Sequence, residues 1–225
     1  MSSPKKYITV DAVVFGYEEG NLSLLLVKRG IEPFKGRWAL PGGFVNDNES
    51  LENAVERELN EEAGITLKYL EQLYTFGEPS RDPRGRVISV AYLGLVRPDA
   101  FELSASTDVI EADWFNINDL PKLAFDHKSI IDKALERLRA KITYQPIGFE
   151  LLNTTFSFSE LERLYSSLLG RPIDRRNFRK KIMSFGLLTQ LSEKRKEGPG
   201  RPASLFQFDE DRYKTYLEKG LYFEL

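Results

Sequence analysis

The order of apolar and polar residues predicts strands and helices that alternate over the first two thirds of the chain. Four runs rich in apolar and β-branched residues are typical of strands, and they cover residues 7–15, 22–27, 70–76 and 86–96. Apolar residues at intervals of three and four predict helices with one buried face at 50–63 and 126–141. Strands and helices mixed in this way indicate an α/β or α+β domain.

The last third of the chain has a different pattern. Helices are expected at 160–169 and 174–185, and strands at 187–191 and 204–208. Ser157 or Ser159 can cap the first of these helices, and Asp174 can cap the second. Two helices joined by a short turn and followed by a hairpin predict a winged helix-turn-helix.

A boundary between the two patterns is expected at Pro146, because proline commonly follows the end of a helix. It divides the chain into domains at 1–144 and 145–225. The formal net charge of the 225 residues is −2, but residues 171–201 hold 10 basic and only 3 acidic side chains. A basic stretch in a weakly acidic chain indicates an anionic partner for the second domain.

Composition excludes several classes of site. The chain has no cysteine, which excludes disulfides, a thiolate nucleophile and cysteine-ligated zinc. His127 is the single histidine, which excludes a metal cluster of several histidines. No apolar run is long enough for a membrane span, and the first residues lack the apolar core of a signal peptide. We therefore expect a cytoplasmic protein without a membrane partner.

The second helix of the expected winged helix is basic on its outer face. Candidate DNA contacts on this helix are Arg175, Arg176, Asn177, Arg179 and Lys180, and those on the hairpin are Lys194, Arg195, Lys196 and Arg201. Arginine can read guanine and asparagine can read adenine in the major groove, and basic side chains also bind phosphates. A solvated face is the alternative, but the helix pair, the hairpin and the charge agree in order, which favours double-stranded DNA.

Three glutamates share one side of the helix at 50–63. Glu58, Glu61 and Glu62 lie at i, i+3 and i+4, so their carboxylates repel one another. A hard divalent cation with oxygen ligands would offset this repulsion. On these residues alone, a solvated acidic helix face is the stronger alternative.

The surrounding residues change that balance, because together they reproduce the Nudix box. Its defined positions are matched by Gly43, Glu49, Arg57, Glu58, Leu59, Glu61, Glu62, Gly64 and Ile65. The chain therefore resembles a Nudix domain over about residues 7–140. The resemblance implies a mixed sheet between helices and Mg²⁺ held by Glu58, Glu61 and Glu62, which would be catalytic if the domain is a hydrolase. It also implies that Arg57 orients a box glutamate and that Gly43 lets the loop approach a pyrophosphate.

Two further segments bear on a ligand. Residues 113–121 and 123–127 resemble the end of the Nudix domain in ADP-ribose-type members and related regulators. Arg81 and Arg86 lie in a polar loop, from which they could reach the phosphates or hydroxyls of an effector, or simply be solvated. His127 begins a helix, where a lone histidine is more often structural than catalytic.

A Nudix domain joined to a winged helix resembles the Nudix-related transcriptional regulators of the NrtR type, and among them most closely the Bacteroides branch of arabinose regulators (AraR). The resemblance implies a homodimeric repressor that binds a palindromic operator and releases it on binding an effector. The branch implies L-arabinose as effector and sugar-utilisation genes as targets, with ADP-ribose the next choice.

Because the Nudix box is intact, the alternative is a Mg²⁺-dependent hydrolase of ADP-ribose-type nucleoside diphosphates with an accessory DNA-binding domain. An RNA-binding Nudix protein is a third and weaker alternative, because a wing suits duplex DNA and no aromatic RNA-binding strand is found.

Overall fold

The computed structural model describes residues 5–18, 20–103, 108–196 and 201–219. The chain forms two compact units, Met1–Glu136 and Arg137–Leu225. The division falls inside helix α2 (His127–Tyr144), whereas the boundary expected from the sequence lies at the end of that helix. Within the described residues, no helix is both long and apolar enough to cross a membrane.

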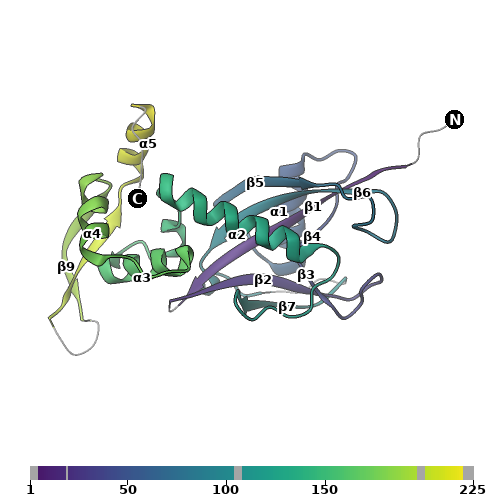
Figure 1. The fold of residues 1–225 in the computed structure, drawn as a ribbon, viewed down its shortest axis with the longest axis horizontal. Helices are drawn as coiled ribbons and strands as arrows, with labels where there is room; N and C mark the ends of the chain where they lie inside the picture. The colour runs from purple at the N-terminus through teal and green to yellow at the C-terminus, as the bar shows by residue number, and fades with distance from the viewer. Residues whose placement is uncertain (1–4, 19, 104–107, 197–200, 220–225) are drawn as a thin grey trace. The chain divides into compact units, whose positions relative to one another are not determined.

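The first unit is built on one mixed sheet (Figure 1). Its strands are β1 (Tyr7–Glu18), β2 (Asn21–Arg29), β3 (Trp38–Ala39), β4 (Gly42–Phe44), β5 (Tyr69–Phe76), β6 (Val87–Val96) and β7 (Val109–Asn116). The central path runs β3-β2-β1-β6-β5, with β4 added to β1 and β7 added to β2. Strand β1 pairs in parallel with β6 and antiparallel with β2, so the sheet is mixed as expected.

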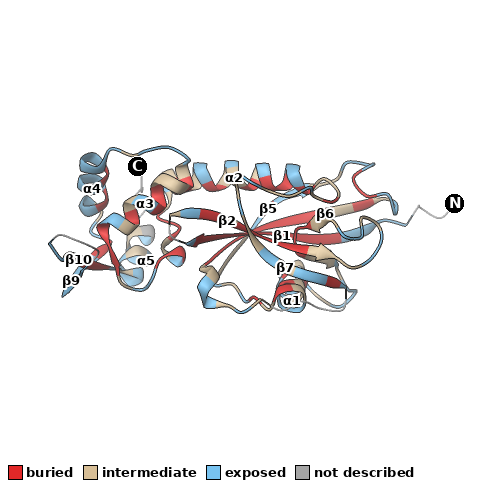
Figure 2. Cartoon of the chain, turned by 90° about the horizontal axis from the view of Figure 1, so that it is seen from below, coloured by how far each residue is buried: buried red, intermediate tan, exposed pale blue. Residues whose placement is uncertain are grey.

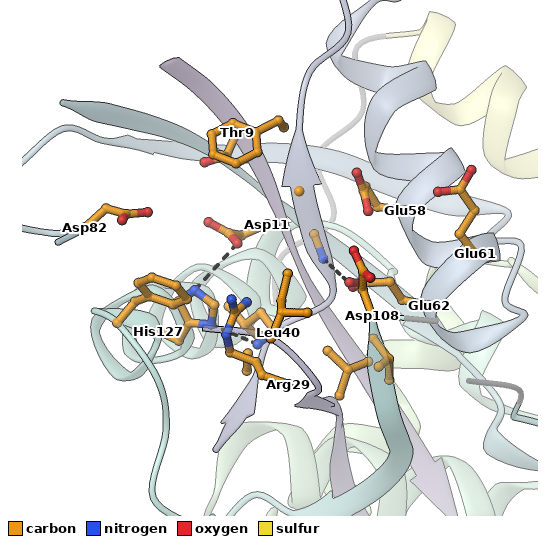
Figure 3. A pocket seen from close by; sticks show the side chains of 18 of the residues that line it. Thr9, Asp11, Arg29, Leu40, Glu58, Glu61, Glu62, Asp82, Asp108 and His127 are labelled. Carbon is orange, nitrogen blue, oxygen red and sulfur yellow. Dashed lines mark hydrogen bonds and ion pairs between the residues drawn. The ribbon is translucent and has the colours of Figure 1, made fainter. Parts of the chain in front are cut away.

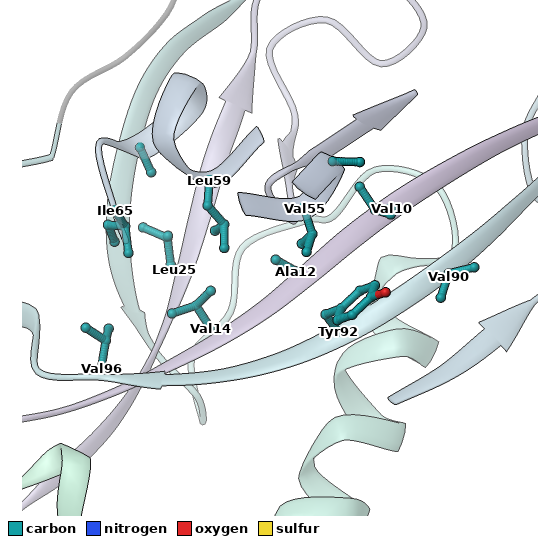
Figure 4. Packing of buried hydrophobic residues seen from close by; sticks show 12 residues of the cluster. Val10, Ala12, Val14, Leu25, Val55, Leu59, Ile65, Val90, Tyr92 and Val96 are labelled. Atoms are coloured by element: carbon teal, nitrogen blue, oxygen red, sulfur yellow. The ribbon is translucent and has the colours of Figure 1, made fainter. Parts of the chain in front are cut away.

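Two helices cover opposite faces of this sheet (Figure 2). Helix α1 (Leu51–Ala63) lies on one face and the first turns of α2 lie on the other. The side chains on the α1 face form one apolar cluster, shown in Figure 4. Val10, Ala12 and Val14 of β1 meet Val55 and Leu59 of α1, because every second residue of a strand points to the same face.

Capping residues place the ends of α1 where the sequence predicts them. The Ser50 side chain accepts a hydrogen bond from the backbone N–H of Asn53, 3.1 Å away. Gly64 ends the helix with a φ of 70°, a left-handed conformation that glycine adopts without steric cost. The helix that carries the Nudix box is therefore fixed at both ends by local sequence.

The second unit is a winged helix. After the short helix η2 (Phe149–Leu151), its elements are β8 (Phe156–Ser157), α3 (Phe158–Leu169), α4 (Arg175–Ser184), β9 (Leu188–Arg195), β10 (Ala203–Phe208) and α5 (Glu210–Glu218). Strands β8, β10 and β9 form one sheet in that order. Ser157 and Glu160 form a reciprocal capping box at the start of α3, and Asp174 caps α4. The predicted helix-turn-helix with a following hairpin is confirmed.

Several elements were not predicted from the sequence. Strands β3 and β4 are only two and three residues long and lie among glycines and prolines. Strand β7 pairs with β2 alone and is polar at many positions, so it lacks a continuous apolar run. The short helices η1 (Pro98–Ala100) and α5 carry no strong apolar stripe either. Residues 197–200, the expected tip of the wing, lie outside the described residues.

Candidate functional site

A cavity of about 370 Å³ opens in the first unit beside α1 (Figure 3). Its walls come from β1, β2, β4, α1, the loop between β5 and β6, and the loop that precedes α2. Carboxylates and guanidinium groups dominate its lining, and Figure 3 shows side chains from separate elements directed into it. The cavity therefore suits a polar ligand that carries charge.

The three glutamates of α1 all line this cavity, but their environments differ. The Glu58 side chain is 12% exposed, whereas that of Glu61 is 55% exposed. Glu62 accepts a hydrogen bond from the backbone N–H of Gly42, 2.9 Å away. Leu59 and Val55 turn into the core on the other side of the helix, as the pattern predicts.

Arg57 links the glutamates of the box. Its guanidinium donates to Glu49 at 2.7 Å and 3.0 Å, to Glu58 at 2.7 Å and to Glu61 at 3.2 Å. It also donates to the carbonyl oxygen of Phe44 at 3.1 Å. The hydrogen bonds from Arg57 lower the pKa of Glu49 to about 2. Arg57 thus ties α1 to the end of β4 and orients three box carboxylates.

Glu62 lacks a comparable partner. Burial raises the pKa of Glu62 to about 8, and the nearby Glu58 carboxylate contributes, while the hydrogen bond from Gly42 opposes the shift. Burial also raises the pKa of Glu58, although Arg57 opposes it. The two carboxylates therefore lie in a partly desolvated wall, where Arg57 pairs with Glu58 and Glu62 has no ion pair among the described residues.

This donor set fits a hard cation in its chemistry. Carboxylate oxygens are the ligands that Mg²⁺ prefers, and a cation would restore charge balance at Glu58 and Glu62. In the described part of the chain, however, no three Asp, Glu or His side chains gather closely enough to hold a metal ion. Glu61 in particular is turned toward Arg57 and solvent.

Gly43 is required by a close approach. A Cβ atom at this position would lie 2.3 Å from Oε1 of Glu58 and 2.9 Å from its Oε2. The sequence-based interpretation assigned this space to a pyrophosphate, but here the carboxylate of Glu58 lies against the glycine. A Cβ atom at Gly42, whose φ is 151°, would likewise come too close to the backbone of Val10.

Of the two arginines expected in an effector pocket, only Arg81 lines the cavity. Its guanidinium binds Asp126 at 2.8 Å and 3.0 Å and lies 3.4 Å from Asp11. Asp11 in turn accepts a hydrogen bond from the hydroxyl of Ser89. Arg86 is not part of the wall, because it donates instead to the carbonyl of Gly77. That expectation is corrected: Arg84, from the same loop, lines the cavity in its place.

His127 is part of the cavity wall and is almost fully buried. Its Nδ1 accepts a hydrogen bond from the backbone N–H of Leu40, 2.8 Å away, so the proton of the neutral ring is on Nε2. Nε2 lies 3.6 Å from Oδ1 of Asp11 (Figure 3). Burial lowers the pKa of His127. The histidine thus anchors the loop of Leu40 as a neutral ring, which agrees with the structural role.

Sequence reasoning missed several polar residues of the wall. Asp11 and Thr9 interrupt an apolar strand, and a buried polar residue in such a run is a signal that could have identified them. Nη2 of Arg29 and Oγ1 of Thr9 are buried and have no hydrogen-bond partner among the described residues. Because buried polar atoms are nearly always paired, these two point to a ligand.

The second unit presents a basic surface on α4. Figure 2 shows most of this helix as exposed, and only Phe178 and Ile182 are buried. The exposed candidates for DNA contact are Arg175, Arg176, Asn177, Arg179, Lys180, Lys194, Lys196 and Arg201. Arg195 is only partly exposed and forms an ion pair with Glu160 of the capping box, and the exposed Arg175 lies 3.6 Å from Glu162. Arg179 lies over the ring of Phe158, 4.4 Å from its centroid, while remaining exposed.

Comparison with known proteins identifies both units. The chain matches the NUDIX domain over residues 5–137 and the NrtR DNA-binding winged helix domain over residues 148–208. It is 32% identical over 209 residues to the ADPR responsive transcriptional repressor NtrR of Acinetobacter baylyi, which covers 91% of this chain and 83% of that protein. It is 46% identical over 125 residues to the ADP-ribose pyrophosphatase of Methanocaldococcus jannaschii, covering 56% of this chain and 73% of that protein.

Solved structures agree with this assignment. NrtR of Shewanella oneidensis in complex with a 27mer DNA has a TM-score of 0.80 and 37% identity, covering 92% of this chain and 95% of that one. The NUDIX domain of the same protein in complex with ADP ribose has a TM-score of 0.57 and 40% identity, covering 60% of this chain and 90% of that one. The comparisons do not support a special closeness to the arabinose regulators.

Proposed function

The chain belongs to the Nudix family, in the NrtR type that carries a DNA-binding winged helix, and from this premise we propose that it is a transcriptional repressor whose Nudix domain binds ADP-ribose. Binding of ADP-ribose lowers the affinity of the winged helix for its operator. The observation that carries the proposal is the presence, on one chain, of a basic recognition helix and a charged cavity.

The DNA-binding half of the proposal is supported by the surface of α4. Arg176 and Lys180 are exposed. The acidic residue Asp174 caps the helix at the position before its first residue. Basic side chains on a recognition helix neutralise phosphates and read base edges in the major groove. Arg195 forms an ion pair with Glu160, which joins the wing to the start of α3. We therefore assign Arg195 a structural role before a DNA contact.

ADP-ribose is favoured over L-arabinose by the chemistry of the cavity. L-arabinose is a neutral sugar, whereas the wall presents the glutamates of α1 and a guanidinium nitrogen of Arg29 that has no partner in the described part of the chain. A diphosphate with ribose hydroxyls uses both kinds of group. Two relatives whose names concern ADP-ribose point the same way. The expectation that sugar-utilisation genes are the targets depended on L-arabinose as effector, so it is no longer supported.

Hydrolysis is the second candidate function, because every defined position of the Nudix box is present. Glu58 and Glu62, with Glu61 after a rotation of its side chain, would hold Mg²⁺. When bound, the metal would activate water and shield phosphate charge. Arg57 would orient the carboxylates, as it does here. A regulator that slowly consumes its own effector is compatible with both candidates.

We propose a homodimer as the form that binds DNA. Two recognition helices on a palindromic operator must reach half-sites about 34 Å apart or a multiple of it. An effector that favours a different arrangement of the dimer would therefore lose one half-site.

The effector is tested by thermal shift of the purified chain with ADP-ribose, NAD, L-arabinose and other pentoses. A ligand that binds the folded state raises the melting temperature by mass action, and we expect this for ADP-ribose. A shift with L-arabinose alone would replace the proposed effector. Parallel assays for hydrolysis of ADP-ribose, with Glu61→Gln as the inactive control, separate a sensor from an enzyme.

A further inference from the structure

Helix α4 presents one apolar side chain to solvent. Met183 is 39% exposed, and in the described part of the winged helix, residues 148–196 and 201–219, it is the one exposed large apolar side chain. The other exposed positions of α4 are occupied by basic or polar residues (Figure 2). A single exposed apolar side chain is ordinary on a protein surface, so the place of Met183 on the helix decides what it means.

Met183 lies in one row with two of the basic side chains. Arg176, Lys180 and Met183 stand at i, i+4 and i+7, so they follow one another along a single side of the helix. At about 100° per residue, Met183 is turned about 140° away from the buried Phe178, and Lys180 about 200°. The row therefore faces away from the core. With a rise of about 1.5 Å per residue it is about 10 Å long, which corresponds to about three base pairs.

The contacts that hold α4 on the core come from other residues. Phe178 packs on Tyr165 and on Phe158, with 5.0 Å and 5.9 Å between ring centroids. Ile182 is buried and completes the core-facing stripe of the helix. Shortening the side chain of Met183 should therefore leave the helix and its core contacts in place.

The surroundings of Met183 favour DNA over an apolar protein surface as its partner. Helix α4 carries five basic side chains and no acidic one. An apolar surface that covered Met183 would also take water away from these charges without pairing them, which is unfavourable. The major groove of DNA offers phosphates to the charges and an apolar group to the methionine.

That apolar group is the C5-methyl of thymine. Among the base edges of the major groove it distinguishes thymine, and apolar side chains recognise it. The side chain of methionine is unbranched, flexible and polarisable, so it adapts to an irregular apolar surface. Arginine and lysine instead read the acceptors of guanine or bind phosphates. An apolar residue in the row thus adds a selectivity that the basic residues lack.

We propose that Met183 contacts the C5-methyl group of a thymine in the operator, within about three base pairs of the position that Arg176 contacts. The inference rests on the proposed DNA binding and deepens it, because it gives the recognition helix a preference for thymine that its charged side chains do not supply. In a palindromic operator, each half-site carries one such thymine.

The test replaces thymine by deoxyuridine, which forms the same base pair and lacks only the C5-methyl group. The operator is first selected from genomic fragments, and each thymine of one half-site is then replaced in turn. Fluorescence anisotropy gives the affinity of the full chain for every duplex. We expect one replacement to lower the affinity of the wild type about four-fold, the effect of burying one methyl-sized group. In Met183→Ala, the same replacement should change nothing.

Matched variants separate the methyl contact from a disturbance of the helix. Met183→Leu stays apolar and should keep the preference for thymine, whereas Met183→Gln ends in a polar group and should lose it. Met183→Gln also serves if Met183→Ala fails to fold. Ile110→Ala removes another exposed apolar side chain, from β7 of the first unit, and should bind as the wild type does. The slope of log K against log salt should stay the same in Met183→Ala, because no phosphate contact is lost.

The contrary outcomes are distinct from one another. If the wild type binds every deoxyuridine duplex as tightly as the original, or if Met183→Ala keeps the preference for thymine, the assignment is overturned and Met183 is left to a partner other than DNA. A smaller salt slope in Met183→Ala would show that the substitution displaces the basic residues, which also overturns it. These results leave the proposed function intact. If the wild type prefers no genomic fragment over random duplex, the proposed function fails together with this inference.

Discussion

The charged residues of the cavity differ in whether other side chains of the protein pair with them. Arg57 and Arg81 are each held by two or more carboxylates. Among the described residues, Glu62 accepts a single hydrogen bond, from a backbone N–H, and Nη2 of Arg29 donates none. Burying charge without a partner is unfavourable, so the protein retains these groups at a cost in stability. We interpret the balanced residues as scaffold and the unbalanced ones as binding groups.

Glu62 should therefore respond to a divalent cation. At pH 8, Mg²⁺ is expected to raise the melting temperature of the wild type, because a cation relieves the repulsion between Glu62 and Glu58. Glu62→Gln should lose most of this rise, while Glu56→Gln, on the exposed side of α1, should keep it. The measurement is thermal unfolding with Mg²⁺ against a chelator. The same rise in all three proteins would show that the metal binds elsewhere.

His127 predicts a loss of stability in acid. Burial lowers its pKa in the folded state, so the unfolded state binds the proton first as the pH falls below about 6.5. The free energy of unfolding should then fall by up to about 1.4 kcal/mol per pH unit, the limit for one proton. His127→Gln, which can still accept from Leu40, should show a shallower dependence below pH 6.5. Urea unfolding between pH 7.5 and 5.5 measures both, and parallel curves would contradict this assignment.

At the scale of elements, α4 carries most of the DNA contacts proposed for the second unit. Phe178 and Ile182 fix it against α3, and Phe178 packs on Tyr165 with 5.0 Å between ring centroids. The remaining side chains of the helix stay exposed. The helix therefore separates its packing face from a basic face that is free for DNA.

Arg176→Ala should weaken operator binding and reduce its dependence on salt. Each lost phosphate contact is expected to lower the magnitude of the slope of log K against log salt by about 0.9. Lys128→Ala, an exposed position on α2 in the other unit, is the control. Fluorescence anisotropy over a salt series gives the slopes. If the slope of Arg176→Ala stays unchanged while specificity relaxes, the residue reads a base instead.

The elements that the sequence predicts are those whose signal is local. The apolar period and the caps Ser50, Asp174 and Gly64 place three helix ends, because each cap bonds within its own turn. Strands β4 and β7 were missed because their stability depends on pairing with β1 and β2, which no local pattern encodes. Short strands acquire their conformation from partners distant in the sequence.

The residues of the candidate site also differ in whether a local sequence signal predicts them. The glutamates of α1 were found because the Nudix box places them on one helix. Thr9, Arg29, Phe44, Arg84 and Phe125 come from different segments, and only the folded chain brings them together. Arg81 and Arg86 share one loop, and sequence spacing alone did not distinguish which of them faces the cavity.

At the scale of the whole molecule, the account requires coupling between two units of one chain. ADP-ribose can lower operator affinity only by as much as its own affinity differs between the free and the DNA-bound protein. Linkage requires that operator DNA weaken ADP-ribose binding by the same factor. This reciprocity holds for any structural route between the two sites.

The most direct test measures the affinity of the full chain for its operator with and without ADP-ribose. The operator is first selected from genomic fragments, and random duplex of equal length serves as the reference. We expect clear preference for the selected fragment and an affinity lower by about 5- to 150-fold when ADP-ribose saturates the protein. No preference for any fragment, together with rapid hydrolysis of ADP-ribose, would show instead an ordinary metal-dependent hydrolase.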